Sequence, residues 1–246
     1  MSHKASPTIV LVHGAFADAS SWNGVIPLLE AAGLEVTAPA NPLRGIAIDS
    51  AYTASVFEQI DGPVLAVGHS YGGAVICNAA TQASNVIGLV FVAAFATDDG
   101  ETLGEATPES KDSVLNTALV PHNYPNNGGT SVEFSINPAK VREAFAGDLS
   151  AEQIALIGAT QRPISELAFS EASGPPAWKR LPSWAVVATG DKAAGADLVR
   201  SMAERAGATI TEIEGSHVIM ISQPQAVTDV IMQALAAVTA PEHAHA

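Results

Sequence analysis

The chain has little cysteine and little positive charge, and each shortage excludes a class of protein. Its 246 residues include one cysteine, Cys77, which rules out an internal disulfide and fits a reducing cytoplasm. Only 11 lysines and arginines stand against 25 acidic residues, so the formal net charge is −14. Without a basic cluster the chain lacks the positive face that binds nucleic acid, and acidic membranes are expected to repel it.

Long apolar runs are also absent. Although 48% of the residues are hydrophobic, Gly, Pro, His or a charged residue interrupts each run before the roughly 20 residues that span a bilayer. Residues 1–7 lead directly into a strand-like segment, so no secretory signal peptide is expected and a cytoplasmic location is predicted. The expected partner is a small-molecule substrate, and the chain is not expected to bind nucleic acid or a membrane. A homodimer is possible.

Short apolar segments alternate with helix-like segments along the chain. The β-branched run Thr8–His13 stops at Gly14, which is typical of a buried parallel strand. Six such runs, joined by helices, predict an α/β fold with a mostly parallel six-stranded sheet covered by helices on both faces. The expected strands are Thr8–His13, Leu34–Ala38, Val64–Val67, Val86–Val92, Ala185–Ala188 and Thr209–Ile213.

Two helix boundaries have recognisable signals. Ser20 or Ser21 is expected to cap one helix that continues to Gly33. The last helix is expected to open with Ser222–Gln225, which has the Ser-x-x-Gln form of a capping box.

Residues 97–181 interrupt the alternation of strands and helices. This region is rich in Pro, Asn, Gly and Ser, as in Pro121–Gly129, and it shows no clear strand. Because it lies between two expected strands, we predict an inserted cap at the carboxyl edge of the sheet. The expected organisation is a core of residues 1–96 and 182–240, a cap or lid of residues 97–181, and a flexible tail of residues 241–246.

The most informative motif is Gly68-His69-Ser70-Tyr71-Gly72. Gly-x-Ser-x-Gly is frequent by chance in a chain with 20 glycines, but here it follows an apolar strand and precedes a helix of small residues. That is the setting of a nucleophile elbow, in which the serine backbone is strained and glycines let strand and helix approach closely. The motif predicts Ser70 as a nucleophile, with an ordinary turn as the alternative.

A nucleophilic serine needs a base and an orienting acid. His217 follows the last strand and precedes the last helix, at the sheet edge that carries Ser70, and is the expected base. Asp191 directly follows the fifth strand and is the favoured acid, while Asp98 and Asp99 after the fourth strand stay as alternatives. The remaining histidines, which lie at the termini, beside the nucleophile, in the insertion or after the first strand, are His3, His13, His69, His122, His243 and His245.

Acyl transfer also needs donors for the oxyanion. The backbone N–H groups of Ala15 and Tyr71 are the natural pair, with Phe16 as an alternative to Ala15. No His-Glu-x-x-His, paired-cysteine or Gly-x-Gly-x-x-Gly pattern occurs, so neither a metal nor another cofactor is expected.

With these motifs in this order, the chain resembles the α/β-hydrolase superfamily over nearly its whole length. The nearer resemblance is to a compact branch that holds plant hydroxynitrile lyases, plant methyl esterases of the salicylate-binding type and bacterial esterase relatives. It implies a triad of Ser70, Asp191 and His217 under a cap. The segments that carry the resemblance are His13–Ala15, Ser20–Trp22, Ile26–Leu29, Gly68–Gly73, Thr189–Asp191, Ser216–Met220 and Ser222–Gln225.

Two positions depart from the lyase pattern. Lyases of this branch carry a threonine and a lysine where this chain has Gly14 and Val218, which favours the esterase side. We therefore expect a serine esterase for a small, largely apolar ester, with Phe16, Trp178 and Val218 contacting substrate. The alternatives are lactonase, C–C hydrolase, perhydrolase or lyase chemistry on the same scaffold, and a non-catalytic ligand receptor.

Overall fold

The main sheet has six parallel strands in the order β2-β1-β3-β4-β8-β9. The structure is a computed structural model that describes residues 6–240. The four interior strands β1, β3, β4 and β8 are buried on both faces because helices cover both sides of the sheet, which confirms the predicted α/β arrangement. The strands are β1 (Thr8–Val12), β2 (Glu35–Thr37), β3 (Val64–His69), β4 (Val86–Val92), β8 (Ser183–Ala188) and β9 (Thr209–Ile213).

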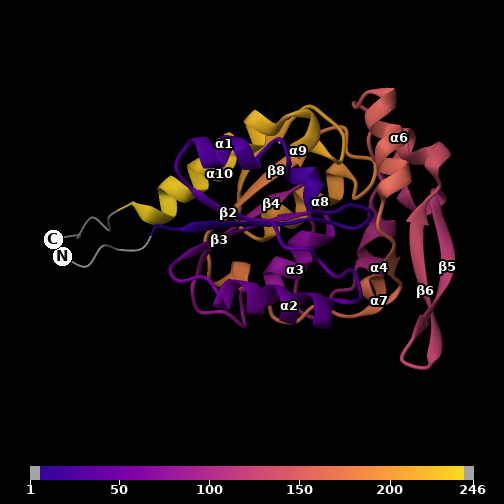
Figure 1. Ribbon diagram of the computed structural model, residues 1–246, viewed down its shortest axis with the longest axis horizontal. Coiled ribbons are helices and arrows are strands. Elements are labelled where there is room, and N and C mark those ends of the chain that lie inside the picture. Colours follow the sequence, from indigo (N-terminus) through magenta and orange to yellow (C-terminus); the bar gives the residue numbers. More distant parts are fainter. Residues whose placement is uncertain (1–5, 241–246) are drawn as a thin grey trace.

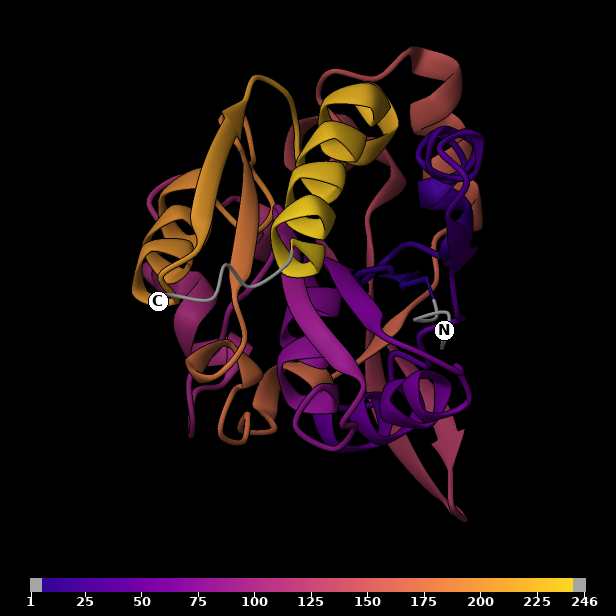
Figure 2. The ribbon, with the colours of Figure 1, turned by 90° about the vertical axis from the view of Figure 1, so that its left-hand side faces the viewer.

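Helices lie on the two faces of this sheet. Figure 1 shows α1 (Ile26–Ala31) and α10 (Pro224–Thr239) on one face, and α2 (Ile46–Glu58) and α3 (Tyr71–Ala79) on the other. Figure 2, seen from the end at which α10 finishes, shows α10 running along its side of the sheet. A further helix, α8 (Ala196–Arg205), connects β8 to β9.

The helix expected from Ser20 or Ser21 to Gly33 ends at Gly33 as predicted, where φ is 80°, but its single continuous course and its cap are wrong. The structure has a 3-10 helix at Ala19–Trp22 and then α1, and the cap of the first is Asp18, whose side chain accepts the Ser20 N–H. Pro27 has no N–H to donate, so a continuous helix through it would lose a backbone hydrogen bond. At the second residue of α1 the missing donor costs nothing.

The capping box expected at Ser222–Gln225 is also wrong. Ser222 ends the short helix α9 (Ile219–Ser222), and α10 begins at Pro224 without a side-chain cap. A capping box does form at Ser150–Gln153, at the start of α6 (Ala151–Thr160).

Residues 97–181, the insertion, contain strands, contrary to the expectation of none. β5 (Leu119–Asn126) and β6 (Gly129–Ile136) form an antiparallel hairpin, and β7 (Ile164–Ser165) pairs with β6. Asn127 and Gly128 make the turn with φ of 47° and 81°, the backbone that Asn-Gly favours in a two-residue hairpin. The prolines in β5 are tolerated because β5 is an edge strand.

The insertion lies at the end of the molecule opposite the last turn of α10. Figure 1 shows α6 and the β5–β6 hairpin there, beyond the strands of the main sheet. Within residues 6–240, no helix is long and apolar enough to cross a membrane. The tail predicted to be flexible, 241–246, falls outside the described residues. The short helices of the insertion are α4 (Leu103–Ala106), α5 (Val141–Ala144) and α7 (Leu167–Ser170).

Candidate active site

Ser70 sits in a sharp turn between β3 and α3. Its backbone has φ 52° and ψ −123°, a strained conformation for a residue with a side chain. A Cβ on Gly68 would lie 2.5 Å from the Gly72 carbonyl oxygen, and one on Gly72 would overlap the Val12 carbonyl oxygen. The prediction that these glycines permit the close approach of strand and helix is therefore confirmed.

Gly14 is subject to a similar constraint. A Cβ at this position would lie 2.6 Å from the Ser70 Cβ and 2.8 Å from the His69 carbonyl oxygen. The loop after β1 can pack against the Ser70 turn only because residue 14 has no side chain.

His217 and Asp191 are brought together beside this turn. The His217 Nδ1–H donates to Asp191 Oδ2 over 2.9 Å, and both side chains are buried. The second carboxylate oxygen, Oδ1, accepts the backbone N–H groups of Ala193 at 2.8 Å and Ala194 at 3.1 Å. Because the carboxylate can only accept, it fixes the proton on Nδ1 and leaves Nε2 of His217 free to accept a proton.

Asp98, one of the alternative acids, lies elsewhere. Its carboxylate pairs with Lys179 and accepts the Asp99 N–H, and the Lys179 contact lowers the pKa of Asp98. Of the three aspartates considered from the sequence, the structure thus places Asp191 on His217.

His69 supports the backbone of His217. Its Nε2–H donates to the His217 carbonyl oxygen over 2.9 Å, and the two ring centroids are 4.7 Å apart. Complete burial, followed by the proximity of His217, lowers the pKa of His69 well below its ordinary value, so this ring is neutral near pH 7. His69 therefore holds the loop that carries His217, and it does so without adding charge to the site.

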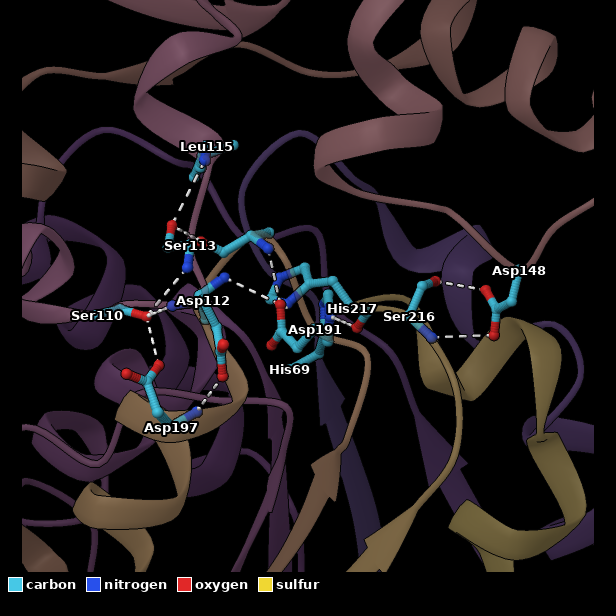
Figure 3. Close-up of polar contacts among 12 residues, drawn as sticks. His69, Ser110, Asp112, Ser113, Leu115, Asp148, Asp191, Asp197, Ser216 and His217 are labelled. Atoms are coloured by element: carbon cyan, nitrogen blue, oxygen red, sulfur yellow. Dashed lines mark hydrogen bonds and ion pairs between the residues drawn. The ribbon is translucent and has the colours of Figure 1, made fainter.

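Asp148, which sequence analysis missed, holds the same loop from the insertion. Its Oδ2 accepts the Ser216 N–H over 3.0 Å and its Oδ1 accepts the Ser216 hydroxyl (Figure 3). Burial opposes its ionisation, but these hydrogen bonds prevail and lower the pKa of Asp148. Asp148 follows α5 in a region without a motif. It takes this role because the fold brings it next to Ser216, although the two residues are far apart in the sequence.

We predict that Asp148→Asn lowers kcat for ester hydrolysis about tenfold with little change in KM, since a charge-assisted hydrogen bond contributes about 1.5–3 kcal/mol. Asparagine keeps one acceptor, so one of the two Ser216 donors loses its partner and the His217 loop loosens. The matched control is Asp229→Asn, on the exposed surface of α10, which is expected to leave kcat unchanged. Equal steady-state rates for Asp148→Asn and the unmodified protein would contradict this role.

The insertion also contacts the loop that carries Asp191. The Val114 N–H donates to the Lys192 carbonyl over 2.8 Å, and the Ser113 hydroxyl donates to the Ala193 carbonyl. On the following helix, Asp197 accepts hydrogen bonds from Ser110 (Figure 3) and from the Lys111 N–H. Both loops that form the His217–Asp191 pair are thus fastened to the insertion.

Ala15, Phe16 and Tyr71, whose backbone N–H groups are the candidate oxyanion donors, line one cavity with Ser70. Tyr71 is the first residue of α3, so its N–H has no partner within the helix. Ala15 and Phe16 form a turn after Gly14, and no described residue accepts a hydrogen bond from either N–H. The Tyr71 hydroxyl donates to Asp49 over 2.7 Å, so the polar end of its side chain is already engaged. The backbone N–H of Tyr71 is therefore the donor that this residue can offer beside Ser70.

Two cavities adjoin the site. The inner cavity, of about 20 Å³, is lined by Ser70, His217, Ala15 and Tyr71 among others. The outer cavity, of about 200 Å³, lies between the core and the insertion. Phe16 and Phe145 line both cavities, with their rings edge to face at a centroid distance of 6.2 Å.

The three side chains expected to contact substrate occupy different places. Phe16 lines both cavities and Val218 lines the outer one. Trp178 lines neither: its indole N–H donates to the Thr97 carbonyl over 3.0 Å and Lys179 covers its ring. The structure therefore brings Trp178 to neither cavity, and its contact with substrate stays a prediction. Its place in the chain, close before β8, gave no indication that its ring is held in this way.

The other described histidines take no part in the site. His13 accepts the Asn41 N–H at Nε2, and burial lowers its pKa to about 4. His122 is exposed on β5. Within residues 6–240, no three His, Cys, Asp or Glu side chains gather in a way that would bind a metal ion. His3, His243 and His245 lie outside that range.

Comparison with known proteins shows which family and which relatives the whole chain is similar to. A model described as "Alpha/beta hydrolase family" matches residues 9–230. Salicylic acid-binding protein 2 of Nicotiana tabacum is 29% identical, over 90% of this chain and 94% of that protein. Methylesterase 2 of Arabidopsis thaliana is 28% identical, over 92% of this chain and 95% of that protein. The crystal structure of polyneuridine aldehyde esterase superposes with a TM-score of 0.77 at 24% identity, covering 93% of this chain and 99% of that chain.

Proposed function

Since this chain belongs to the alpha/beta hydrolase family, we propose that it hydrolyses carboxylic esters with Ser70 as nucleophile, His217 as base and Asp191 as orienting acid. The observation that carries the proposal is the strained Ser70 turn, which shares a cavity with a His217 ring held by Asp191. Relatives named as a methylesterase and as polyneuridine aldehyde esterase support ester hydrolysis.

In the first half of the reaction, Ser70 Oγ attacks the ester carbonyl carbon as His217 Nε2 takes the hydroxyl proton. The carbonyl oxygen becomes an oxyanion, which the N–H groups of Tyr71 and Ala15 stabilise, with Phe16 as the alternative to Ala15. When the tetrahedral intermediate collapses, the bond to the alkoxy oxygen breaks and His217 returns the proton to that oxygen. The alcohol leaves and the acyl group stays on Ser70.

In the second half, a water molecule replaces the alcohol. His217 removes its proton while the water oxygen attacks the acyl carbon, and the same N–H groups hold the second oxyanion. The bond to Ser70 Oγ then breaks, Ser70 recovers its proton from His217, and the carboxylic acid leaves. Throughout, Asp191 stabilises the protonated ring without becoming protonated itself.

The insertion serves as the cap in this proposal. Residues from it line both cavities, and its hydrogen bonds reach the loops of His217 and Asp191. A cap of this kind keeps water away from the acyl-enzyme until the alcohol has left.

The single cysteine supports a cytoplasmic location for the enzyme.

Cyanohydrin cleavage is disfavoured by the space around Gly14. Lyases of this branch carry a threonine there, yet in this chain even a methyl group at residue 14 would stand 2.6 Å from the Ser70 Cβ. Val218 is uncharged and buried, so it supplies no cation for cyanide.

The test is covalent labelling. We expect a fluorophosphonate to modify one residue, Ser70, located by peptide mapping, and the labelled protein to lose hydrolysis of short p-nitrophenyl esters in proportion to the label. Cys77, which is buried and whose pKa is raised by that burial, is not expected to react. Absence of label at Ser70, or full ester hydrolysis after labelling, would overturn the proposal.

A further inference from the structure

The loop after β1 carries one of the two proposed oxyanion donors, and its backbone is strained. Phe16 has φ 60°, a left-handed conformation that a residue with a side chain adopts only where its surroundings hold it. Gly14 packs against the Ser70 turn, and Ala15 lines the inner cavity together with Ser70. Contacts from other parts of the fold are therefore needed to hold the Ala15 N–H in one direction.

The His13 ring makes the contact that bears most directly on this direction. Its Nδ1–H donates to the Gly14 carbonyl oxygen over 2.9 Å. The Gly14 C=O and the Ala15 N–H belong to one planar trans peptide group, in which these two bonds point in opposite directions. A hydrogen bond that fixes the Gly14 carbonyl therefore also fixes where the Ala15 N–H points. His13 itself lines neither cavity, so it acts on the site only through this peptide.

The groups around the other ring nitrogen decide where His13 carries its proton. The Asn41 N–H donates to Nε2 over 3.0 Å, and Nη1 of Arg162 lies 3.3 Å from the same atom. Both groups can only donate, so Nε2 must accept and the ring proton must be on Nδ1. Burial, and to a smaller extent the charge of Arg162, lowers the pKa of His13 to about 4, so the ring is neutral near pH 7.

Arg162 reaches this ring from the insertion. Its Nη1 also donates to the Asn41 carbonyl oxygen over 2.9 Å, and the Asn41 side-chain Nδ2 donates to the His13 carbonyl oxygen over 3.0 Å. One guanidinium thus holds both the ring and the residue that faces it. Arg162 is itself anchored, because the side chain of the preceding Gln161 binds both the N–H and the C=O of Ile136 at the end of β6.

We propose that Arg162 is a positioning residue for the oxyanion hole, through which the insertion sets the direction of the Ala15 N–H. The guanidinium keeps Nε2 of His13 as an acceptor, so the Nδ1–H stays on the Gly14 carbonyl and the Ala15 N–H stays in place for the oxyanion. Arg162 lines neither cavity, so binding of the unreacted ester does not depend on it. This role rests on the proposed function, and it is separate from covering the cavities.

Arg162→Gln tests the role, with Arg180→Gln, at an exposed arginine of the same insertion, as its control. Loss of an oxyanion donor lowers kcat by about 10²- to 10³-fold, so a donor that is only loosened is expected to cost about tenfold. We expect Arg162→Gln to lower kcat for a short p-nitrophenyl ester by this factor, with KM unchanged within about twofold. Arg180→Gln is expected to change neither. The kcat values are counted per Ser70 labelled by fluorophosphonate, so that unfolded protein does not contribute.

Trifluoroacetone measures the oxyanion hole directly. Ser70 Oγ adds to the ketone carbon, His217 takes the hydroxyl proton, and the carbonyl oxygen becomes an oxyanion without any bond to carbon being broken. Because this adduct resembles the transition state, its inhibition constant is expected to rise about tenfold in Arg162→Gln, in step with the fall in kcat/KM.

A double-variant comparison shows whether Arg162 acts through His13. In a His13→Asn background, Arg162→Gln is expected to have no further effect on kcat, because the ring that it holds is gone. A tenfold loss that persists in this background would overturn the role, and so would an unchanged kcat, or a raised KM alone, in the single variant Arg162→Gln.

Failure of the proposed function gives a different result. In that case the unmodified protein hydrolyses no ester and fluorophosphonate leaves Ser70 unmodified. If only the role of Arg162 is wrong, Ser70 is labelled and the unmodified protein is active, while Arg162→Gln either matches Arg180→Gln in kcat or loses as much without His13 as with it.

Discussion

Ser70→Ala is expected to lower kcat for ester hydrolysis by about 10⁴- to 10⁶-fold, because no other group can form the acyl-enzyme. The oxyanion donors are backbone N–H groups and stay in place, so a small residual rate above that in water remains. Initial rates with a chromogenic ester, together with circular dichroism to confirm folding, provide the measurement. Alanine retains a Cβ, so the turn keeps its strained backbone and the melting temperature is expected to change little.

Ser70→Gly is the informative companion to this variant. The φ of 52° and ψ of −123° at Ser70 cost about 1–3 kcal/mol for a residue with a side chain, and glycine relieves most of that cost. We expect Ser70→Gly to be as inactive as Ser70→Ala and more stable to urea. Substantial activity in either variant would show that Ser70 is not the nucleophile, and equal stability of the glycine variant would show that the turn stores no strain.

The parts of the fold that follow from local sequence were predictable. Each core strand is a short run of apolar residues, and a strand buried on both faces leaves that pattern wherever it occurs. The Ser70 turn was predictable for a similar reason, because two glycines at fixed spacing are a local requirement of close approach. That Ser70, Asp191 and His217 lie at one edge of the sheet followed from the rule that parallel strands end at the same edge.

The parts that depend on contacts across the chain were not predictable. Asp148 lies 68 residues from Ser216 in sequence, and no pattern at either residue announces their hydrogen bonds. Phe145 reaches both Phe16 and His217 only after the insertion has folded over the core. The β5–β6 hairpin is different, because Asn127-Gly128 is a strong local turn signal; the prolines in β5 concealed it.

The insertion is hydrogen-bonded to both loops of the proposed triad and also lines the cavities beside it. Asp148 holds Ser216 next to His217, Ser113 holds the loop that carries Asp191, and Phe145 borders both cavities. A change in the insertion is therefore expected to alter the geometry of His217 and Asp191 along with substrate fit. This coupling explains why a region without sequence motifs is so extensively hydrogen-bonded to the two loops.

Asp191→Asn is expected to lower kcat about 10⁴-fold, which is the effect of the corresponding change in other Ser-His-Asp enzymes. The direction follows from the hydrogen bonds at this residue. The N–H groups of Ala193 and Ala194 both donate to Oδ1, so the asparagine must keep its carbonyl oxygen there and turn its NH₂ group toward His217. The ring then has to accept at Nδ1 and carry its proton on Nε2, where it cannot accept the proton of Ser70.

The matched control for this variant is Asp98→Asn, which removes a carboxylate from the pair with Lys179 and is expected to leave kcat unchanged. Steady-state rates of both variants provide the comparison, with melting temperatures to exclude unfolding. Because asparagine occupies nearly the same volume, Asp191→Asn is expected to fold and to keep KM within a few-fold of its original value. A large loss in Asp98→Asn, together with a small one in Asp191→Asn, would transfer the role of the acid to Asp98. A loss confined to Asp191→Asn would instead show that His217 depends on a single carboxylate to present Nε2 to Ser70.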